Sequence, residues 1–195
     1  MTAPHAQGTD PKSALRERLI QIVSDRSLLR GTEMKLASGA SSSFYFDMKR
    51  TAFHPEGASL IAELILYELS DISVDYVGGL EMGAVPLVAC VIQKSFPEHP
   101  IGGFFVRKQP KEHGTRRLIE GLPQDESLAG KSIVLLEDVT TTGGSVIKAI
   151  TAVREEGAHV PAVVTVVDRL QGASENLQRE NVALRPLLTV EDFSL

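Results

Sequence analysis

The feature that most constrains the fold is a regular alternation of short apolar runs with longer amphipathic segments. Four runs have the length and composition of buried strands: DYVGGL (75–80), IGGFFV (101–106), SIVLLE (132–137) and AVVTVVD (162–168). GAVPLVACVIQKS (83–95) and GSVIKAITAVREEG (144–157) carry apolar residues at helical spacing. The alternation predicts an α/β fold with a mostly parallel central sheet flanked by helices, whose ligands bind at the carboxyl ends of the strands.

The residues before this alternation predict a helix and a small accessory ribbon. Asp10 is a plausible N-cap followed by proline, and apolar residues continue on one helical face as far as Val23. MKLASGASSSFYFDMKR (34–50) has two strand-like pieces around a Ser/Gly-rich turn. A second helix is predicted from Ala58. We therefore expect one domain over residues 1–195, with residues 30–52 as a small hood over the sheet.

The stretch VLLEDVTTTGGS (134–145) combines two adjacent acids with an anion-binding type of loop. It joins a predicted strand to a predicted helix, and the free N–H groups at a helix start favour phosphate. The acids would repel phosphate, but they accept hydrogen bonds from sugar hydroxyls and stabilise a developing cation. A sugar phosphate satisfies both halves. The predicted binding residues are Glu137, Asp138, Val139, Thr140, Thr141, Thr142, Gly143, Gly144 and Ser145.

Other phosphate motifs fit this stretch less well. A Walker loop needs a lysine before its Ser/Thr, and a Rossmann fingerprint places its acid after the glycines. The remaining alternative is an ordinary strand-to-helix turn in which Asp138 and the threonines only cap the helix. A second turn, GGLEMGAV (78–85), is equally compatible with a tight turn or a binding role.

The segment RKQPKEHGTRR (107–117) is strongly basic, with five Lys or Arg residues and one Glu on a chain whose net charge is −5. The acidic body argues against general affinity for nucleic acid or membranes. A basic segment on such a body indicates a small, highly anionic ligand. A solvated basic loop without function is the alternative.

Cellular location is predicted from two features. The first residues lack the basic start and apolar centre of a signal peptide, and no apolar stretch approaches a membrane span. The one cysteine, Cys90, lies in the apolar run VPLVACVI, which suits a buried thiol in a reducing compartment. We expect a cytoplasmic protein.

These motifs together resemble the type I phosphoribosyltransferases, and among them the orotate phosphoribosyltransferase family. VLLEDVTTTGGS is similar to the motif for 5-phosphoribosyl 1-diphosphate (PRPP). FVRKQPKEHGTRRLIEG resembles the mobile catalytic loop of the orotate enzymes, and LASGASSSFYFDMKR resembles their N-terminal hood. The likeness extends loosely from about Leu29 to Arg169.

The resemblance implies transfer of a phosphoribosyl group from PRPP to orotate in pyrimidine biosynthesis, giving orotidine 5′-monophosphate and diphosphate. It implies a Mg²⁺ cofactor held mainly by the substrate, with a water-mediated contact to Asp138, and a homodimer whose loop (107–121) closes over the neighbour's site. It also assigns roles: Arg169 and Thr141 to orotate, Arg107 to substrate binding, and catalysis to Lys108, Lys111, His113 and Asp138. Positive charge on the ribose suits the acids, and the leaving diphosphate suits the basic loop.

The chain departs from the resemblance at two positions. Ala37 and Met82 stand where some family members carry lysines, and Lys35 lies two places from the first. Two other functions therefore stay open. One is transfer to a different base, against which Arg169 and the hood argue. The other is a non-catalytic sensor of PRPP, which would not need the lysines of the basic loop.

Overall fold

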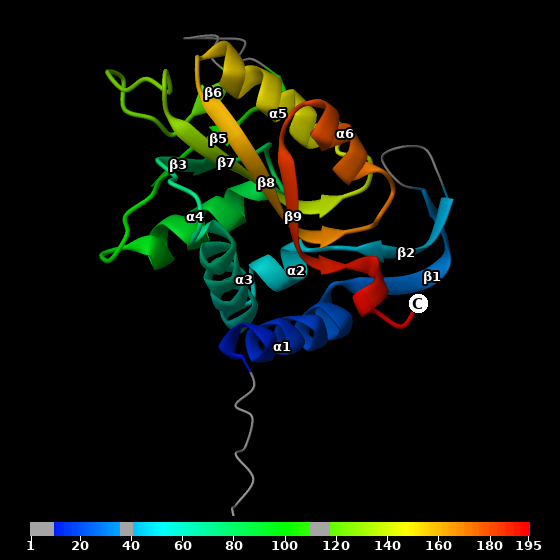
Figure 1. Cartoon of the computed structure of the whole chain (residues 1–195). Helices are drawn as coiled ribbons and strands as arrows, with labels where there is room; N and C mark the ends of the chain where they lie inside the picture. Colours follow the sequence, from blue (N-terminus) through cyan, green and yellow to red (C-terminus); the bar gives the residue numbers. More distant parts are fainter. Residues whose placement is uncertain (1–9, 36–40, 110–117) are drawn as a thin grey trace, which may run out of the picture.

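The computed structural model describes residues 10–35, 41–109 and 118–195. Its centre is a parallel sheet of five strands in the order β4-β3-β7-β8-β9 (Figure 1). These are β3 (Tyr76–Gly78), β4 (Gly102–Gly103), β7 (Ser132–Thr140), β8 (His159–Asp168) and β9 (Ala183–Thr189). The predicted parallel α/β sheet is confirmed, and β9 adds a strand that the apolar runs did not indicate.

Helices cover both faces of the sheet. Helices α1 (Pro11–Arg26), α3 (Pro55–Leu69) and α4 (Ala84–Ser95) share one apolar core, and α5 (Gly144–Glu155) and α6 (Ala173–Arg179) belong to the other side (Figure 1). Alternate residues of β7 feed the two cores: Val134 and Leu136 enter the first, Ile133 and Leu135 the second. All four are fully buried, which explains why this strand is an unbroken apolar run.

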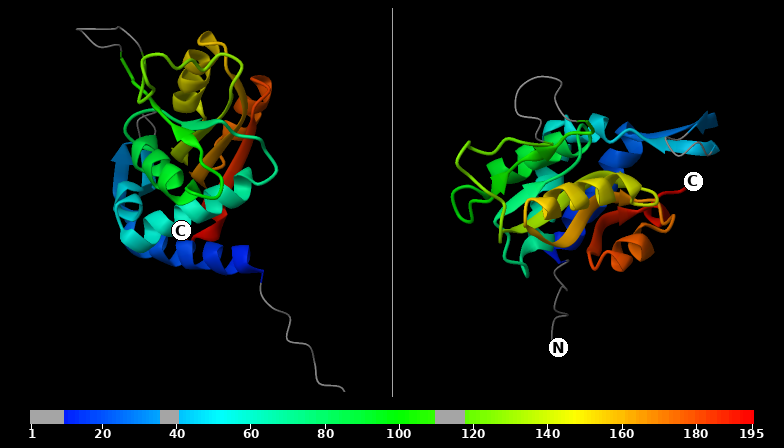
Figure 2. Two further views of the ribbon diagram at one scale, coloured as in Figure 1. Left: turned by 90° about the vertical axis from the view of Figure 1, so that its left-hand side faces the viewer. Right: turned by 90° about the horizontal axis from the view of Figure 1, so that it is seen from above.

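The hood is an antiparallel ribbon of β1 (Leu28–Lys35) and β2 (Ser41–Phe46), followed by the one-turn helix α2 (Lys49–Ala52). It projects to one side of the main body (Figure 2). The C-terminal segment holds it in place, because the rings of Phe46 and Phe193 lie 5.0 Å apart and Arg30 donates to the carbonyl of Ser194 at 2.6 Å. The C-terminal segment also forms a short 3-10 helix (Val190–Asp192) with a capping box at Thr189.

The predicted strand IGGFFV is two strands in the structure. β4 lies in the main sheet, whereas β5 (Phe105–Val106) pairs with β6 (Ile119–Glu120) in a separate antiparallel ribbon. This ribbon brackets the predicted catalytic loop, and Arg107 N donates to the Leu118 carbonyl at 2.8 Å. Arg107, at the start of the predicted loop, and Leu118, near its end, are therefore hydrogen-bonded to each other, and residues 110–117 lie outside the described part.

Several local predictions can be compared directly. Asp10 caps α1, since its carboxylate accepts from Lys12 N at 3.2 Å. Cys90 is only partly buried and packs against the first apolar core, and burial raises the pKa of its thiol. In the described segments 10–35, 41–109 and 118–195, no helix is both long and apolar enough to span a bilayer.

Candidate active site

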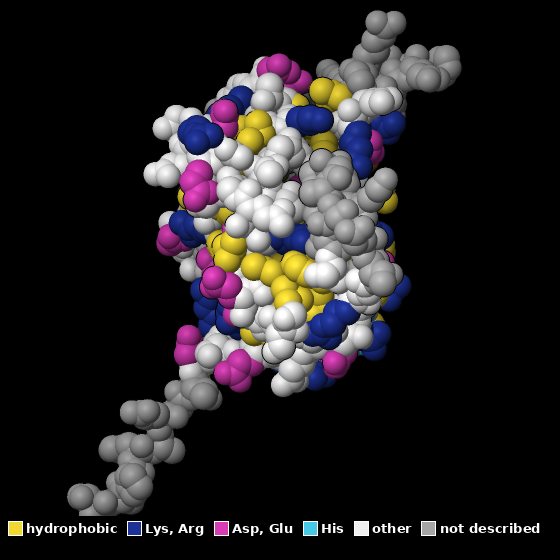
Figure 3. Space-filling model, turned by 90° about the vertical axis from the view of Figure 1, so that its right-hand side faces the viewer, with side chains coloured by type: hydrophobic (Ala, Val, Ile, Leu, Met, Phe, Trp, Pro, Cys, Tyr) yellow, Lys and Arg dark blue, Asp and Glu magenta, His cyan; other side chains and the backbone are white. Residues whose placement is uncertain are grey.

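A cavity of about 370 Å³ opens at the carboxyl ends of the parallel strands, where the sequence predicted a ligand site. Three predicted groups meet there: the adjacent acids, Lys108 of the basic segment, and Arg169. On the space-filling surface, Lys and Arg side chains border a hydrophobic patch on the side that carries the hood (Figure 3). The cavity is lined by Tyr45, Phe46, Lys49, Leu80, Glu81, Met82, Gly83, Lys108, Glu137, Asp138, Val139, Thr141, Ser145 and Arg169.

The loop predicted to bind phosphate forms an adjoining hollow of about 260 Å³. β7 is longer than expected and continues to Thr140, because Val139 and Thr140 pair with Val167 and Asp168 of β8. The turn itself is short. Gly143 has φ of +79°, a left-handed conformation that favours glycine, and α5 begins at the next residue. The hollow is lined by Glu137, Lys148 and every residue from Val139 to Val146.

The two adjacent acids are in different electrostatic states. Glu137 is 7% exposed, and burial, followed by the neighbouring Asp138 carboxylate, raises its pKa well above the usual range. Asp138 is more open, and its Oδ1 accepts from Val139 N at 2.9 Å. Glu137 is therefore less readily ionised than an ordinary glutamate, and both side chains line the cavity.

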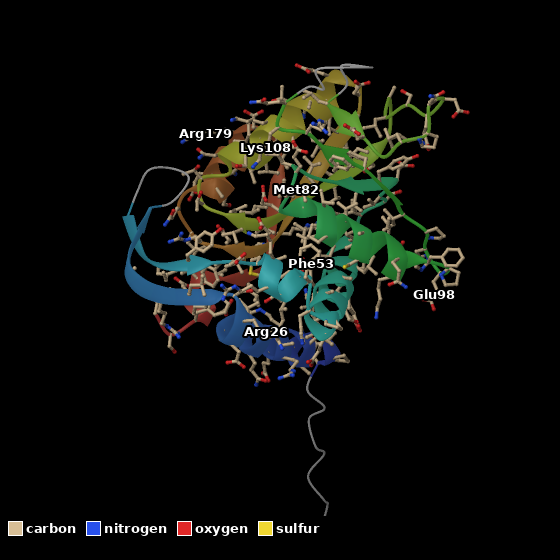
Figure 4. The ribbon with its side chains drawn as sticks, turned by 180° about the vertical axis from the view of Figure 1, so that it is seen from behind. Arg26, Phe53, Met82, Glu98, Lys108 and Arg179 are labelled. Carbon is tan, nitrogen blue, oxygen red and sulfur yellow. The ribbon has the colours of Figure 1, made fainter. Side chains whose placement is uncertain are left out.

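The second glycine turn is part of the site. A Cβ on Gly83 would meet Oδ1 of Asp138 at 2.6 Å, so the missing side chain makes room for that carboxylate. Glu81 accepts from Lys108 N at 2.8 Å and ties the turn to the start of the basic segment. Met82 is 63% exposed and borders the cavity with Lys108 (Figure 4). Of the two readings of this turn, lining a binding site fits better than a plain tight turn.

Arg169 lines the same cavity and contacts the hood. Its guanidinium carbon is 4.4 Å from the centre of the Phe44 ring in the hood, a cation–π contact. Arg169 and Asp168 are only 5% and 3% exposed, so neither is a surface residue. Burial lowers the pKa of Arg169, although a guanidinium stays charged at neutral pH.

Arg107 is placed differently from the other predicted cations. Its Nη1 lies 3.2 Å from Oε1 of Glu120, across the ribbon of β5 and β6, and its Nε donates to the Gln109 carbonyl at 3.2 Å. It borders a neighbouring cavity of about 350 Å³ with Lys108 and Lys148. Lys111 and His113, the other predicted catalytic residues of this segment, lie outside the described residues.

Lys49 is a cavity residue that the sequence reasoning missed. It stands on α2, and its Nζ lies 2.8 Å from Oδ1 of Asp47. Asp47 and, more weakly, Tyr45 and Asp138 raise the pKa of Lys49. Lys49 lies in the hood sequence FYFDMKR, but only the fold brings α2 to the cavity.

The parallel sheet and the strand–loop–helix segment at residues 134–146 are those expected of a phosphoribosyltransferase. Residues 49–182 match the family described as "Phosphoribosyl transferase domain". The orotate phosphoribosyltransferase of Bradyrhizobium sp. (strain ORS 278) is 54% identical over 183 residues, covering 93% of this chain and 98% of the relative. That of Methanocaldococcus jannaschii is 43% identical over 91% of this chain and 96% of the relative.

Solved structures agree. The orotate phosphoribosyltransferase of Mycobacterium tuberculosis H37Rv in complex with Fe(III) dicitrate has a TM-score of 0.80 at 35% identity, covering 93% of this chain and 99% of that one. Its complex with 5-phospho-alpha-D-ribosyl 1-diphosphate (PRPP) has a TM-score of 0.75 at 33% identity, over 91% and 98% of the two chains. This chain belongs to the orotate phosphoribosyltransferase family.

Proposed function

We propose that the protein transfers the phosphoribosyl group of PRPP to orotate, giving orotidine 5′-monophosphate and diphosphate, in pyrimidine biosynthesis. The observation that carries the proposal is one cavity with three chemically distinct parts. Thr141 and Ser145 of the phosphate loop, the Asp138 carboxylate, and Arg169 with its contact to Phe44 all border it. We call the part beside the phosphate loop the phosphate end and the part beside Arg169 and the hood the base end. The high identity to orotate phosphoribosyltransferases over nearly the whole chain supports it.

The phosphate loop holds the 5-phosphate of the sugar. Backbone N–H groups at the start of α5, the left-handed turn at Gly143 and the hydroxyls of Thr141, Thr142 and Ser145 are the donors available there. Asn176 donates to the Thr142 carbonyl at 2.8 Å and fixes the loop against α6. The phosphate anchors the ribose ring with C1 toward the centre of the cavity.

Asp138 and Glu137 serve the ribose. Breaking the bond from C1 to diphosphate builds positive charge on the ring, and the charged Asp138 stabilises it. Glu137, whose pKa burial raises, ionises less readily and binds a ribose hydroxyl with less repulsion toward the phosphates than an ordinary glutamate would cause. Lys108, at the rim, stabilises the leaving diphosphate together with Lys111 and His113. Arg107, which is held by Glu120 across the ribbon of β5 and β6, is the remaining residue proposed to bind substrate.

Arg169 and Thr141 recognise the base. A guanidinium can bind the orotate carboxylate through two parallel hydrogen bonds, which a plain uracil ring cannot match. Phe44 holds the guanidinium from the hood side, and Val139 provides an apolar wall. Selectivity for a carboxylated pyrimidine follows from this end of the cavity.

Phosphoribosyltransferases generally use Mg²⁺ with PRPP, and the donor set here fits a metal held mainly by substrate. Among the described residues, no three His, Cys, Asp or Glu side chains converge on one point. Asp138 is a half-buried carboxylate of the cavity and would reach the metal through water. When bound, Mg²⁺ neutralises diphosphate and supports its departure.

The first test is turnover. Purified protein with Mg²⁺ and PRPP should consume orotate, followed by loss of its absorbance, while uracil and hypoxanthine are not consumed. Consumption of another base instead would contradict the assignment of orotate. Tight PRPP binding without turnover of any base would favour the non-catalytic sensor.

The active form is proposed to be a cytoplasmic homodimer in which residues 107–121 close over the neighbour's site. The exposed apolar side chains of Phe53 (73%) and Met82 (63%) provide surface for a second copy (Figure 4). Mixing inactive Lys111→Ala with inactive Asp138→Asn should restore part of the activity, because a mixed dimer contains one intact site. No recovery after subunit exchange, verified by mass, would contradict shared sites.

A further inference from the structure

A set of buried hydrogen bonds joins the phosphate strand to the base-binding arginine. Thr140 and Asp168 are register partners in β7 and β8. Oγ1 of Thr140 donates to Oδ1 of Asp168 at 3.0 Å, and the same oxygen accepts from Leu170 N at 3.1 Å. Arg169 N donates to the Thr140 carbonyl at 2.9 Å. The backbone is thus held on both sides of Arg169 by one threonine and one aspartate.

The turn after Arg169 depends on these bonds. Leu170 has φ of +54°, a left-handed conformation that is rare for leucine, and its side chain is 48% exposed. Packing of Leu170 therefore does not hold this turn, whereas the bond from its N–H to Asp168 does. Because the turn sets the direction in which the Arg169 side chain leaves β8, the Asp168 carboxylate controls where the guanidinium lies.

Thr140 also differs from the other hydroxyl residues of its loop. It is 2% exposed, and its hydroxyl proton is used by Asp168. Thr140 lines the phosphate hollow, but neither Thr140 nor Asp168 is among the described residues that line the large cavity, which Thr141 borders. The Thr140 hydroxyl is accordingly placed to act on a neighbouring residue.

We propose that Asp168 and the Thr140 hydroxyl are positioning residues that fix Arg169 for orotate, acting from the strand that ends in the phosphate loop. The inference rests on the proposed function, in which Arg169 binds the orotate carboxylate. The inference gives the Thr140 hydroxyl a different role from the loop hydroxyls that are proposed to bind phosphate. Loss of its bond should harm orotate recognition and spare PRPP binding.

The test is steady-state kinetics with both substrates varied. Thr140→Val is nearly isosteric and removes only the donor, so it should raise KM for orotate about tenfold, the usual effect of losing a hydrogen bond to a charged group. KM for PRPP should change less than about twofold, since backbone N–H groups of the loop remain. Thr140→Ser keeps the donor and should return KM for orotate toward the wild-type value. The matched control is Thr151→Val on the exposed side of α5, where no effect is expected.

Variants of Asp168 complete a double-mutant cycle with Thr140→Val. Asp168→Ala should raise KM for orotate at least as much as Thr140→Val, whereas Asp168→Asn keeps an accepting oxygen and should be milder. Adding Thr140→Val to Asp168→Ala should cause little further loss, because both changes remove one interaction. If Asp168→Ala does not fold, the valine and serine variants decide alone.

Three results would overturn the inference: an unchanged KM for orotate in Thr140→Val, an equal rise in KM for PRPP, or effects that add fully in the double variant. In each of these three cases the wild-type protein still turns over orotate. Failure of the proposed function is distinct, because the wild type itself would then show no turnover with orotate, and that result would remove both proposals.

Discussion

The phosphate end and the base end of the cavity are built in opposite ways. The phosphate end is one continuous stretch, residues 137–145, which passes from strand to turn to helix. The base end is assembled from Phe44 in β2, Lys49 in α2 and Arg169 after β8, three elements well separated along the chain. A local motif brings its own backbone geometry, whereas the base end depends on the packing of the hood against the sheet.

The difference predicts how each end responds to change. Substitutions at the phosphate end should act on kcat through the groups that they remove, because the backbone of the loop stays in place. Thr140 and Thr141 are the exceptions, since the first is proposed to position Arg169 and the second is assigned to the base. Substitutions at the base end should act on KM for orotate, including those that only disturb position. Five variants test this division.

The largest effect is expected from Asp138→Asn. The carboxylate is the charged group placed to stabilise the developing cation, and removing one preorganised group typically costs about 10²–10³-fold in kcat. Steady-state kinetics would measure it. Asp125→Asn, at an exposed position, is the control. A kcat within about threefold of wild type would contradict the role of Asp138.

Arg169→Lys should raise KM for orotate by roughly 10²-fold, because lysine cannot form the bidentate pair with a carboxylate. KM for PRPP should remain nearly unchanged. Arg179→Lys on the surface of α6 provides the matched control. An equal rise in both KM values would mean that the two ends are not independent in the way described.

Gly83→Ala tests the contact between the two glycine-containing turns. Its backbone is right-handed helical, so alanine causes no backbone strain, but its Cβ would lie 2.6 Å from Oδ1 of Asp138 and displace that carboxylate. We expect kcat to fall about tenfold, since misplacement of a catalytic group by 1 Å costs up to about 10²-fold. Gly31→Ala, where a Cβ has open space, should be silent.

Lys49→Met should raise KM for orotate by only about threefold, because the ammonium is solvent-exposed and its charge is screened. The effect should shrink as salt is added. Arg50→Met is the control, since Arg50 also pairs with Asp47 but is not among the described cavity residues. Equal effects of the two variants would assign the change to the Asp47 pair alone.

The smallest effect concerns stability and pH. The pKa of Glu137 is raised in the folded protein, so over a range above its ordinary value of 4.5 the folded state keeps a proton that the unfolded chain has lost. Wild-type stability should therefore fall as pH rises through this range, while Glu137→Gln lacks this loss. Melting temperatures at a series of pH values should converge below pH 4.5 and separate above it, with the glutamine variant higher. Parallel curves would contradict a protonated Glu137.

The sequence predicted the features that depend on neighbours in the chain. Val134 and Leu136 identified the central strand, and the glycines that follow the acids at 137–138 identified the turn from this strand into a helix. Arg169 was assigned through the resemblance, but its contact with Phe44 was not, because that contact exists only once the hood has packed. The place of Lys49 in the cavity was missed for the same reason, because it also depends on the packing of the hood.

Two further features could not be predicted for physical reasons. The split of IGGFFV into β4 and β5 reflects pairing with residues 119–120, which no local pattern encodes. The hydroxyl of Thr140 looked like one of three equivalent donors. Only the register of β7 against β8 shows that it is directed to Asp168.

The contacts between the hood and the C-terminal segment affect the order in which parts of the protein can fold during synthesis. Phe46 and Arg30, which belong to the first quarter of the chain, are held by Phe193 and Ser194. A ribosome makes residues in order, and a contact cannot form before its later partner has emerged. The phosphate loop can therefore be complete while the hood still lacks its C-terminal support. A nascent chain stalled before Phe193 emerges should bind PRPP before it discriminates between bases.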